Sequence, residues 1–424
     1  MLDRLKRNAP PAFAELTAIA ASVMALNALA IDMMLPALGR IGTDLGLTNP
    51  NDRQLIVGLY IIGNGVGQLF FGPLVDRWGR RRILLLSLVA YLIGSMLSLL
   101  ASTFFLLIAA RIFQGVATAG ARVGVFAIIR DQYAGRRMAK LISIAVTLFM
   151  AIPIIAPSLG QAVLLFAPWR GIFVALFLYG FAVAVWCYFH LPETLTPEKT
   201  MPLKLGRIAG SYAEFFTNRC ACGYTIASAL CFGALFGYIS AAEQIFLEVF
   251  KVGDLFGIAF AAVAVSLGIA TLTNASLVER FGMRRLTHAA LTGFVAVNFA
   301  HFAVLNLFGE YALVFIGFLS ASFFCIGLIG PNSSALALEK MGHIAGSAAA
   351  ANGFAGTTVA GVLGSVIGRQ FDGTTGPIVI GYVVLGVLAL AIVAWVEDGR
   401  LFRTGEQLGK SADPVPAGSE RPAE

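Results

Sequence analysis

Residues 72–82 read GPLVDRWGRRR, and residues 275–285 read ASLVERFGMRR. The two stretches align without a gap at a constant shift of 203 positions. An acid, an aromatic residue, a glycine and two arginines occupy equivalent places in both copies. Chance similarity between two basic loops is a poor explanation for so many matches in register. The repeat therefore indicates that the chain arose by duplication of one half.

The sequence around the two copies is too apolar for a water-soluble protein. Of its 424 residues, 58% are hydrophobic and only 12% are charged, whereas about a quarter of the residues of a soluble protein are charged. Apolar runs of about 20 residues are what a bilayer core about 30 Å thick requires of a spanning helix. The composition therefore predicts a multi-pass membrane protein.

Twelve runs of this kind are present, in two sets of six. The first set covers approximately residues 14–36, 54–75, 82–102, 105–129, 139–166 and 170–191. The second set covers approximately residues 219–247, 254–277, 284–306, 311–334, 345–369 and 375–396. These runs are too long and too uniformly apolar for the strands of a barrel. We predict an all-α membrane protein with twelve transmembrane helices in two pseudo-symmetric six-helix bundles.

The segments between and beyond the runs define the predicted domains. The bundles cover residues 14–191 and 214–396, and a polar cytoplasmic linker over residues 192–213 joins them. Residues 1–13 form an N-terminal segment. The tail, residues 397–424, is predicted to be disordered because its end is rich in small residues, proline and charge without an apolar period.

The distribution of positive charge predicts the orientation. Of the 30 Lys and Arg residues, 23 lie in the termini and even-numbered loops, five lie in odd-numbered loops, and Arg111 and Arg122 lie inside the fourth run. Lys and Arg accumulate in cytoplasmic loops. Both termini are therefore predicted to be cytoplasmic. The net charge of +7 is interpreted as a topology signal and not as affinity for nucleic acid.

Other classes of protein find little support in the sequence. The five cysteines form no CxxC pair, the four histidines do not cluster, and the motifs of serine hydrolases, zinc proteases and P-loop enzymes are missing. We expect neither an enzyme nor a metal or other cofactor. A sensor or scaffold would need an output domain, and no loop is long enough to hold one.

The loop sequence GPLVDRWGRRR resembles the signature of the major facilitator superfamily. Other segments are similar to the Bcr/CflA group of bacterial drug-resistance transporters, which are drug:proton antiporters. These segments are DMMLPAL at 32–38, GQLFFGPL at 67–74, RIFQG at 111–115, RD at 130–131, WRGIF at 169–173 and LPETL at 191–195. The resemblance covers about residues 14–396. It implies a cavity between the two halves and transport by alternating access.

Asp32 is the one acid that lies clearly inside an apolar run. An intramembrane carboxylate is a functional hypothesis by default. A proton and a cationic substrate would compete for it, which is the coupling step of an antiporter. The resemblance implies that Arg111, together with Gln114, faces the cavity and tunes this acid. The alternatives are that Asp32 caps the first helix and that Arg111 serves packing alone.

A wider set of polar, aromatic and methionine side chains is predicted to line the substrate cavity. Its members are Asn27, Asn64, Gln68, Gln114, Arg122, Phe149, Met150 and Glu243. For Phe149 and Met150, the alternative is packing against protein or lipid. Arg122 either recognises the charge of the substrate or extends its guanidinium along the helix toward water. Glu243 belongs to the segment SAAEQ, where relatives commonly carry Ser-Pro.

The resemblance also implies a conformational gate in the cytoplasmic loops, where a charge network keeps the inside shut in the outward-open state. The predicted members are Gly72, Asp76, Gly79, Arg80, Arg130, Asp131, Glu279 and Arg284. The fifth run is predicted to bend at Pro157 and to pack closely at Gly160, as in the antiporter motif. Ala156 and Gln161 depart from the Gly-Pro and Gly-Gly pairs of that motif.

Together these observations predict a secondary active transporter of the bacterial inner membrane that exports small amphipathic drugs in exchange for protons. The alternative is a proton-coupled transporter dedicated to one metabolite, by symport or export. The expected partners are a small-molecule substrate, protons and the lipid bilayer, without nucleic acid. The resemblance implies a monomer.

Overall fold

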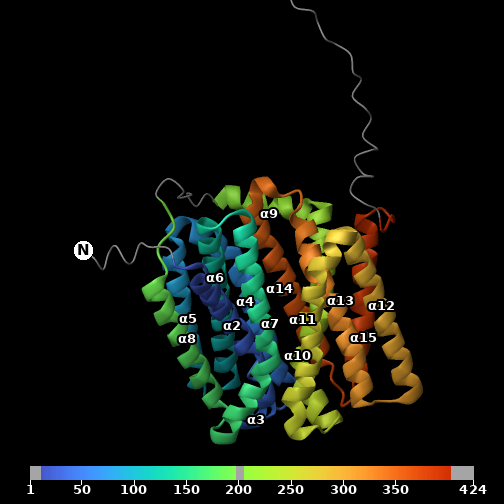
Figure 1. The fold of residues 1–424 in the computed structure, drawn as a ribbon. Helices are drawn as coiled ribbons and strands as arrows, with labels where there is room; N and C mark the ends of the chain where they lie inside the picture. The colour runs from blue at the N-terminus through green and yellow to red at the C-terminus, as the bar shows by residue number, and fades with distance from the viewer. Residues whose placement is uncertain (1–10, 197–204, 403–424) are drawn as a thin grey trace, which may run out of the picture.

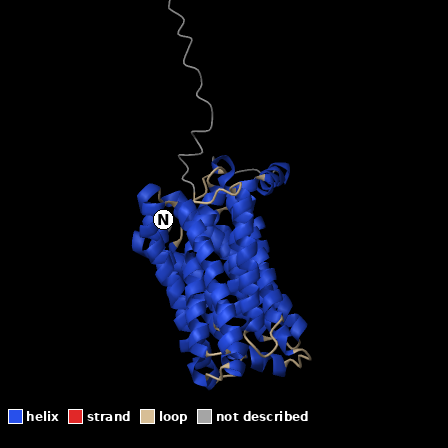
Figure 2. Cartoon of the chain, turned by 90° about the vertical axis from the view of Figure 1, so that its right-hand side faces the viewer, coloured by secondary structure: helices blue, strands red, loops and turns tan. Residues whose placement is uncertain are grey.

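The computed structural model describes residues 11–196 and 205–402, and the regular structure in these ranges is helical throughout. Within these ranges, twelve helices are long and apolar enough to cross a membrane. They run side by side, and most loops gather at the two ends of the bundle (Figures 1 and 2). The predicted all-α fold with twelve transmembrane helices is confirmed.

The two halves contribute equal numbers of these membrane-spanning helices. The first half contains α2 (Phe13–Asp32), α3 (Leu38–Asp44), α4 (Leu55–Trp78), α5 (Arg80–Leu99), α6 (Phe104–Gln132), α7 (Gly135–Phe166) and α8 (Arg170–His190). The second half contains α10 (Arg219–Gln244), α11 (Phe256–Phe281), α12 (Met283–Phe308), α13 (Ala312–Leu338), α14 (Ala345–Arg369) and α15 (Gly376–Val396). Helices α2 and α3 belong to one span, residues 13–44.

That first span is interrupted between its two helices, α2 and α3. Helix α2 ends at Asp32, and a 3₁₀ helix, η1 (Leu35–Ala37), leads into α3. Pro36 has no N–H, so it cannot donate a helical hydrogen bond to the carbonyl of Asp32, four residues earlier. The break therefore follows the intramembrane acid directly.

The two ends of the bundle are named here by what they carry. The terminal face is the end at which α2 begins and α15 ends, at the top of Figure 1. The opposite face is the end that carries α3, at the bottom of Figure 1. Both names are used below without reference to the inside or outside of a cell.

The segment predicted as a linker is partly helical. Helix α9 (Leu205–Thr217) lies across the terminal face (Figure 1). The Tyr212 hydroxyl donates to the carbonyl of Leu69 on α4, at 2.8 Å, and burial raises the pKa of this hydroxyl. Phe215 is fully buried in a cluster with Ala348 of α14. Helix α9 thus contacts both halves, and the predicted bundle boundary at residue 214 falls inside it.

Parts of three predicted segments lie outside the described residues. They are residues 1–10 of the N-terminal segment, residues 197–204 of the linker and residues 403–424 of the tail.

The two halves meet along two helix pairs, α4 with α14 and α7 with α11. Small residues allow the first pair to approach closely. A Cβ atom on Gly65 would lie 2.8 Å from the backbone nitrogen of Thr358, and one on Gly361 would lie 3.3 Å from that of Ile62. Such contacts between membrane helices require glycine. The two halves are therefore in close contact along α4 and α14. Backbone atoms and small side chains form this seam between the halves.

Candidate functional site

Asp32 is the last residue of α2 and only 4% of its surface is exposed. Within the described ranges its carboxylate forms no hydrogen bond and no ion pair. The 3₁₀ helix η1, which begins three residues later, packs against α10 of the second half. The Tyr238 hydroxyl on α10 is also buried and has no hydrogen-bond partner in the described part of the chain. An unpaired intramembrane acid thus lies close to the interface of the two halves.

Arg111 on α6 is fully buried and contacts the main chain of α2 near its end. Its guanidinium donates to the backbone carbonyl of Ala30 at 2.7 Å and to Gln114 Oε1 at 2.5 Å. It also lies 4.3 Å from the centre of the Tyr60 ring. No ion pair joins Arg111 to Asp32 in the described structure. Arg111 therefore holds α2 against α6 through a carbonyl two residues before Asp32.

A polar chain continues from this arginine. Gln114 Nε2 donates to Ser95 Oγ at 2.8 Å. The Tyr60 hydroxyl lies 2.9 Å from Thr118 Oγ1 and donates to Asn27 Oδ1 at 3.1 Å. Of the predicted cavity residues, Gln114 and Asn27 are therefore connected to Arg111 through hydrogen bonds and the Tyr60 ring.

Asn64 and Gln68 lie on α4 at the seam between the halves. Asn64 Nδ2 contacts the carbonyl of Gly115 at 3.4 Å. Gln68 Nε2 contacts Asn64 Oδ1 at 3.3 Å and donates to Thr357 Oγ1 of α14 at 3.1 Å. Gln68 therefore takes part in the contact between the halves, and Asn64 binds it within the first half.

Arg122 is the accessible arginine inside the bundle. Eleven residues of helix place it on the same side of α6 as Arg111, nearer the terminal face. Its side chain is exposed, and its one described contact is the Phe126 ring, 6.0 Å from the guanidinium carbon to the ring centre. The predicted cavity residues Phe149 and Met150 on α7 are half-buried. Arg122 thus offers a positive charge without an acidic partner in the described ranges.

Glu243 lies at the opposite face, where the halves are joined by a group of charged and amide side chains. This opposite-face cluster consists of Arg53, Gln54, Glu243, Gln244 and Glu248. The first two lie on the 3₁₀ helix η2 (Pro50–Gln54), and Glu248 lies on a π-helical turn, η4 (Ile245–Val249), that continues α10. Arg53 hydrogen-bonds Glu248, and its Nε lies 3.5 Å from Glu243 Oε2. Gln54 donates to Gln244.

Further contacts across the opposite face surround this cluster. Asn51 Nδ2 donates to the carbonyls of Arg369 at 3.0 Å and Phe371 at 2.7 Å. Arg369 in turn forms an ion pair with Asp52 at 2.6 Å. Glu243 was predicted from its position in an apolar run, whereas its partners were not predicted, because their loops gave no indication of which residues would meet. The opposite face is closed in this conformation.

The predicted gate residues at the terminal face form a network inside the first half. Arg80 binds Asp76 at 3.2 Å and Asp131 at 2.8 Å. The Thr194 hydroxyl donates to Asp131 at 2.8 Å, and Glu193 accepts from the backbone N–H of Arg80 at 2.8 Å. These contacts join the loop after α4 to the ends of α6 and α8.

Glycine is required at the centre of this network. Gly79 has a φ of +105°, and a Cβ atom there would lie 2.4 Å from Glu193 Oε2. Gly72 faces α14, where a Cβ atom would lie 3.5 Å from the Ala350 side chain. Arg130 is exposed and has no ion pair in the described ranges.

The second copy of the loop forms a similar network with a shifted arginine. Arg284 binds Glu339 after α13 at 3.3 Å and Glu397 after α15 at 2.9 Å. Met283 occupies the place equivalent to Arg80, so the next residue supplies the guanidinium. Glu279, predicted as a gate member, is exposed and has no ion pair in the described part of the molecule. Each network ties helices within one half, and its ion pairs do not cross the interface.

The predicted bend of the fifth span faces the break in the first. Helix α7 continues as an α-helix through Pro157, which is buried. A Cβ atom on Gly160 would lie 2.1 Å from the carbonyl oxygen of Met33. The absence of a side chain at this position therefore lets α7 pack on the residue directly after Asp32.

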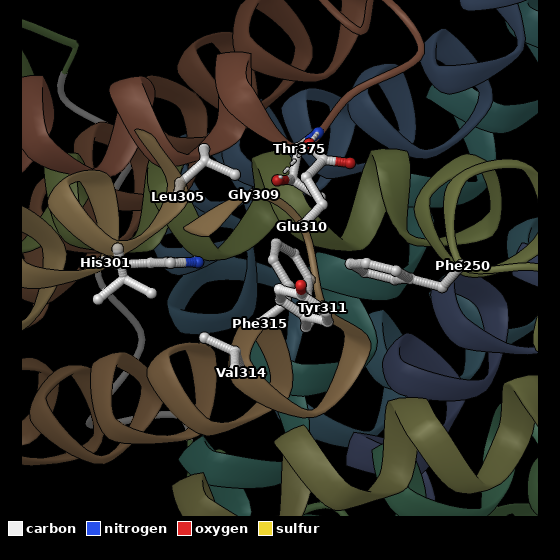
Figure 3. A pocket seen from close by; sticks show the side chains of 10 residues that line it. Phe250, His301, Leu305, Gly309, Glu310, Tyr311, Val314, Phe315 and Thr375 are labelled. Carbon is white, nitrogen blue, oxygen red and sulfur yellow. Dashed lines mark hydrogen bonds between the residues drawn. The ribbon is translucent and has the colours of Figure 1, made fainter. Parts of the chain in front are cut away.

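A small, partly open hollow lies at the opposite face of the second half (Figure 3). His301, with 3% of its surface exposed, lines it, and its Nδ1 has no hydrogen-bond partner among the described residues. Glu310 accepts from the backbone N–H of Thr375 at 2.6 Å and from its hydroxyl at 2.8 Å. Phe250 and Phe315 complete the wall shown in Figure 3. None of the predicted site residues lines this hollow.

Comparison with known proteins supports the assignment by family. Residues 20–365 match the model of the Major Facilitator Superfamily. The chain is 28% identical to a bicyclomycin resistance protein homolog of Haemophilus influenzae, over 85% of this chain and 91% of that protein. It is 30% identical to a chloramphenicol resistance protein of Pseudomonas aeruginosa, over 88% of this chain and 89% of that protein.

The fold agrees with solved structures. A partially occluded inward-open structure of the xylose transporter XylE from E. coli aligns with a TM-score of 0.68 and 16% identity, over 90% of this chain and 97% of that chain. The predicted resemblance to drug-resistance transporters is confirmed by the named relatives. The chain belongs to the Major Facilitator Superfamily, a family of multi-pass membrane transporters.

Proposed function

We propose that this protein exports small amphipathic compounds from a bacterial cell in exchange for protons. The observation that carries this proposal is the carboxylate of Asp32. It is buried and unpaired in the described structure, and η1, which follows it, packs against α10 of the second half. A buried carboxylate without a partner is stabilised either by a proton or by a cation that arrives beside it. Proton and cationic substrate therefore exclude each other at Asp32.

The surroundings of Asp32 support a coupling role. Helix α2 breaks directly after this acid, and Gly160 of α7 packs on Met33. A change in the charge of Asp32 therefore acts at the break in the first span, from which helix movement can follow. In this proposal Arg111 is a positioning residue, because it holds the carbonyl of Ala30 and makes no ion pair with the acid.

Orientation completes the proposal. We assign the terminal face to the cytoplasm and the protein to the inner membrane, because the excess of Lys and Arg lies in the loops of this face. The closed opposite face then corresponds to a conformation in which the outside is shut. The protein is proposed to work as a monomer.

The test is proton release from purified protein in weakly buffered detergent. Tetraphenylphosphonium serves as the lipophilic cation and chloramphenicol as the neutral compound. We expect the parent protein and the control Glu310→Gln to release protons on binding the cation, and Asp32→Asn to release none. Undiminished release by folded Asp32→Asn would show that the proton is held elsewhere.

A second candidate function rests on Arg122. Its accessible guanidinium, without an acidic partner in the described ranges, suits a single anionic metabolite better than a lipophilic cation. Uptake into proteoliposomes separates the two candidates. Transport of anions that is lost in Arg122→Gln, with no transport of the cation by the parent, would favour the dedicated metabolite.

A further inference from the structure

The opposite-face cluster places two acids around one arginine. Arg53 of the first half hydrogen-bonds Glu248 and lies near Glu243, both of the second half. The two acids are five positions apart in the sequence, and the π-helical turn that begins after Gln244 allows both to face the same guanidinium. Arg53 and Glu248 are also the charged side chains that act on Glu243. With both acids ionised, the group carries a net charge of −1.

Glu243 is the more buried of the two acids and has fewer hydrogen bonds to its carboxylate oxygens among the described residues. Its side chain is 8% exposed, whereas that of Glu248 is 50% exposed. Its Oε2 atom is buried and accepts no hydrogen bond from the described residues, although Arg53 Nε lies 3.5 Å away. That Nε is itself buried without an acceptor. The other oxygen, Oε1, lies against Gly39 of α3, where an added Cβ atom would be 2.7 Å from it. One oxygen of Glu243 is therefore available to carry a proton.

A proton on Glu243 resolves the charge imbalance. A buried charge is costly unless it is paired and hydrogen-bonded. Arg53 neutralises one acid, and its hydrogen bond goes to Glu248. When the halves separate at this face, water solvates Glu243 and the cost disappears. The proton is therefore bound more tightly when the face is closed.

We propose that Glu243 is a second proton-binding site, which takes up one proton as the opposite face closes. Proton uptake by Glu243 on closure requires no substrate. Only the role of this uptake in a transport cycle rests on the proposed function. By linkage, a group that binds its proton more tightly in the closed state favours that state at low pH. The opposite face should close as pH falls and open as pH rises. If this face is outside the cell, a proton that binds Glu243 from the outside favours closure of the outer side of the transporter.

The experiment measures closure directly in the whole protein. Spin labels are attached at Thr48→Cys and Leu255→Cys, two exposed positions on different halves of the opposite face, after the five native cysteines are replaced by serine. Pulsed electron paramagnetic resonance in nanodiscs, without substrate, gives the ratio of long to short distances. A single proton changes this ratio by at most about tenfold per pH unit.

We expect the parent protein to open as pH is raised from about 5 to about 9, a range that contains the titration of a buried carboxyl. Glu243→Gln, which mimics the protonated acid, should remain closed throughout. Glu248→Gln, which leaves Arg53 to neutralise Glu243 alone, should remain closed to a higher pH than the parent. An opening of the face in Glu243→Gln would overturn the inference, because the charged acid would then hold the face shut through Arg53.

Two controls separate this site from others. Glu310→Gln removes an acid of the same face that has no hydrogen bond or ion pair with the first half among the described residues, and it should keep the parental pH response. Asp32→Asn should keep it as well. If Asp32→Asn removes the response and Glu243→Gln does not, the inference fails while the proposed coupling at Asp32 gains support. If Glu243→Gln alone removes it, the inference holds whether or not Asp32 couples export.

Discussion

Gln161 on α7 accepts a hydrogen bond from the backbone N–H of Gly257 on α11, with 3.1 Å between Oε1 and N. The first belongs to one half and the second to the other. The N–H groups of the first turn of a helix have no partner within the helix. Gln161 satisfies one of them across the interface. Its departure from the Gly-Gly pair of the antiporter motif therefore adds a contact that joins the halves at the opposite face.

Replacement of Gln161 by leucine should weaken closure of this face. The substitution removes the acceptor and leaves the Gly257 N–H unpaired, at a cost of about 1 kcal/mol to the closed conformation. That free energy corresponds to a shift of about fivefold toward the open conformation. The spin-label pair described above measures the shift, and Leu159→Ala, at an exposed neighbouring position, is the control. An unchanged distance distribution would show that the hydrogen bond has no role in closure.

Gly160→Ala should destabilise the folded protein. The added Cβ atom would lie 2.1 Å from the Met33 carbonyl, so α7 must move away from the broken part of the first span. Overpacking of this kind costs about 1–3 kcal/mol. The control is Gly268→Ala in α11, where nothing lies within 4 Å, and it should be neutral or stabilising. Thermal unfolding in detergent compares the two, and equal melting temperatures would contradict the prediction.

The helices and the first-half network could be predicted because their signals are local. Apolar runs mark the spans, and the duplicated loop brings Asp76 and Arg80 into one short stretch. The partners of Arg53 could not be predicted in the same way. Glu248 is 195 positions away, and the two meet only because the halves pack together. Hydropathy carries no information about which charged residues of distant loops become neighbours.

The relation of Asp32 to Arg111 shows a second limit of sequence analysis. Arg111 was predicted to tune Asp32, and the structure places the arginine against the main chain of the first helix. A guanidinium can bind a backbone carbonyl or a carboxylate equally well in chemical terms. The choice depends on helix rotation and spacing, which a single sequence does not specify.

Arg111→Lys should destabilise the protein although it conserves the charge. Arg111 contacts the Ala30 carbonyl and Gln114 Oε1 at once through a planar group, and it lies over the Tyr60 ring. A lysine ammonium cannot reproduce this fork. We expect a loss of about 2–4 kcal/mol, because buried polar partners are left unpaired. Chemical unfolding measures the loss, and Arg122→Lys, at an exposed site, is the matched control. Equal stability of the two variants would mean that the fork is unimportant.

Asp32→Asn should fold at least as stably as the parent. The carboxylate makes no ion pair or hydrogen bond in the described structure, so no partner loses its contact, while a buried charge is removed. We expect a melting temperature equal to or above that of the parent. A clear decrease would reveal a structural role for the acid and would complicate the use of this variant in proton-release measurements.

In each copy of the duplicated loop, one of the acids that bind it lies after the last helix of its half, Glu193 in the first and Glu397 in the second. In the first half, Glu193 and Thr194 are the final members of the network around Arg80. A ribosome that has released these residues has therefore made every partner of the first loop. The first half can complete its terminal-face contacts before the second half is synthesised, as expected when domains fold in order. The network of the second loop includes Glu397, which is synthesised after α15. This network is therefore completed only near the end of translation.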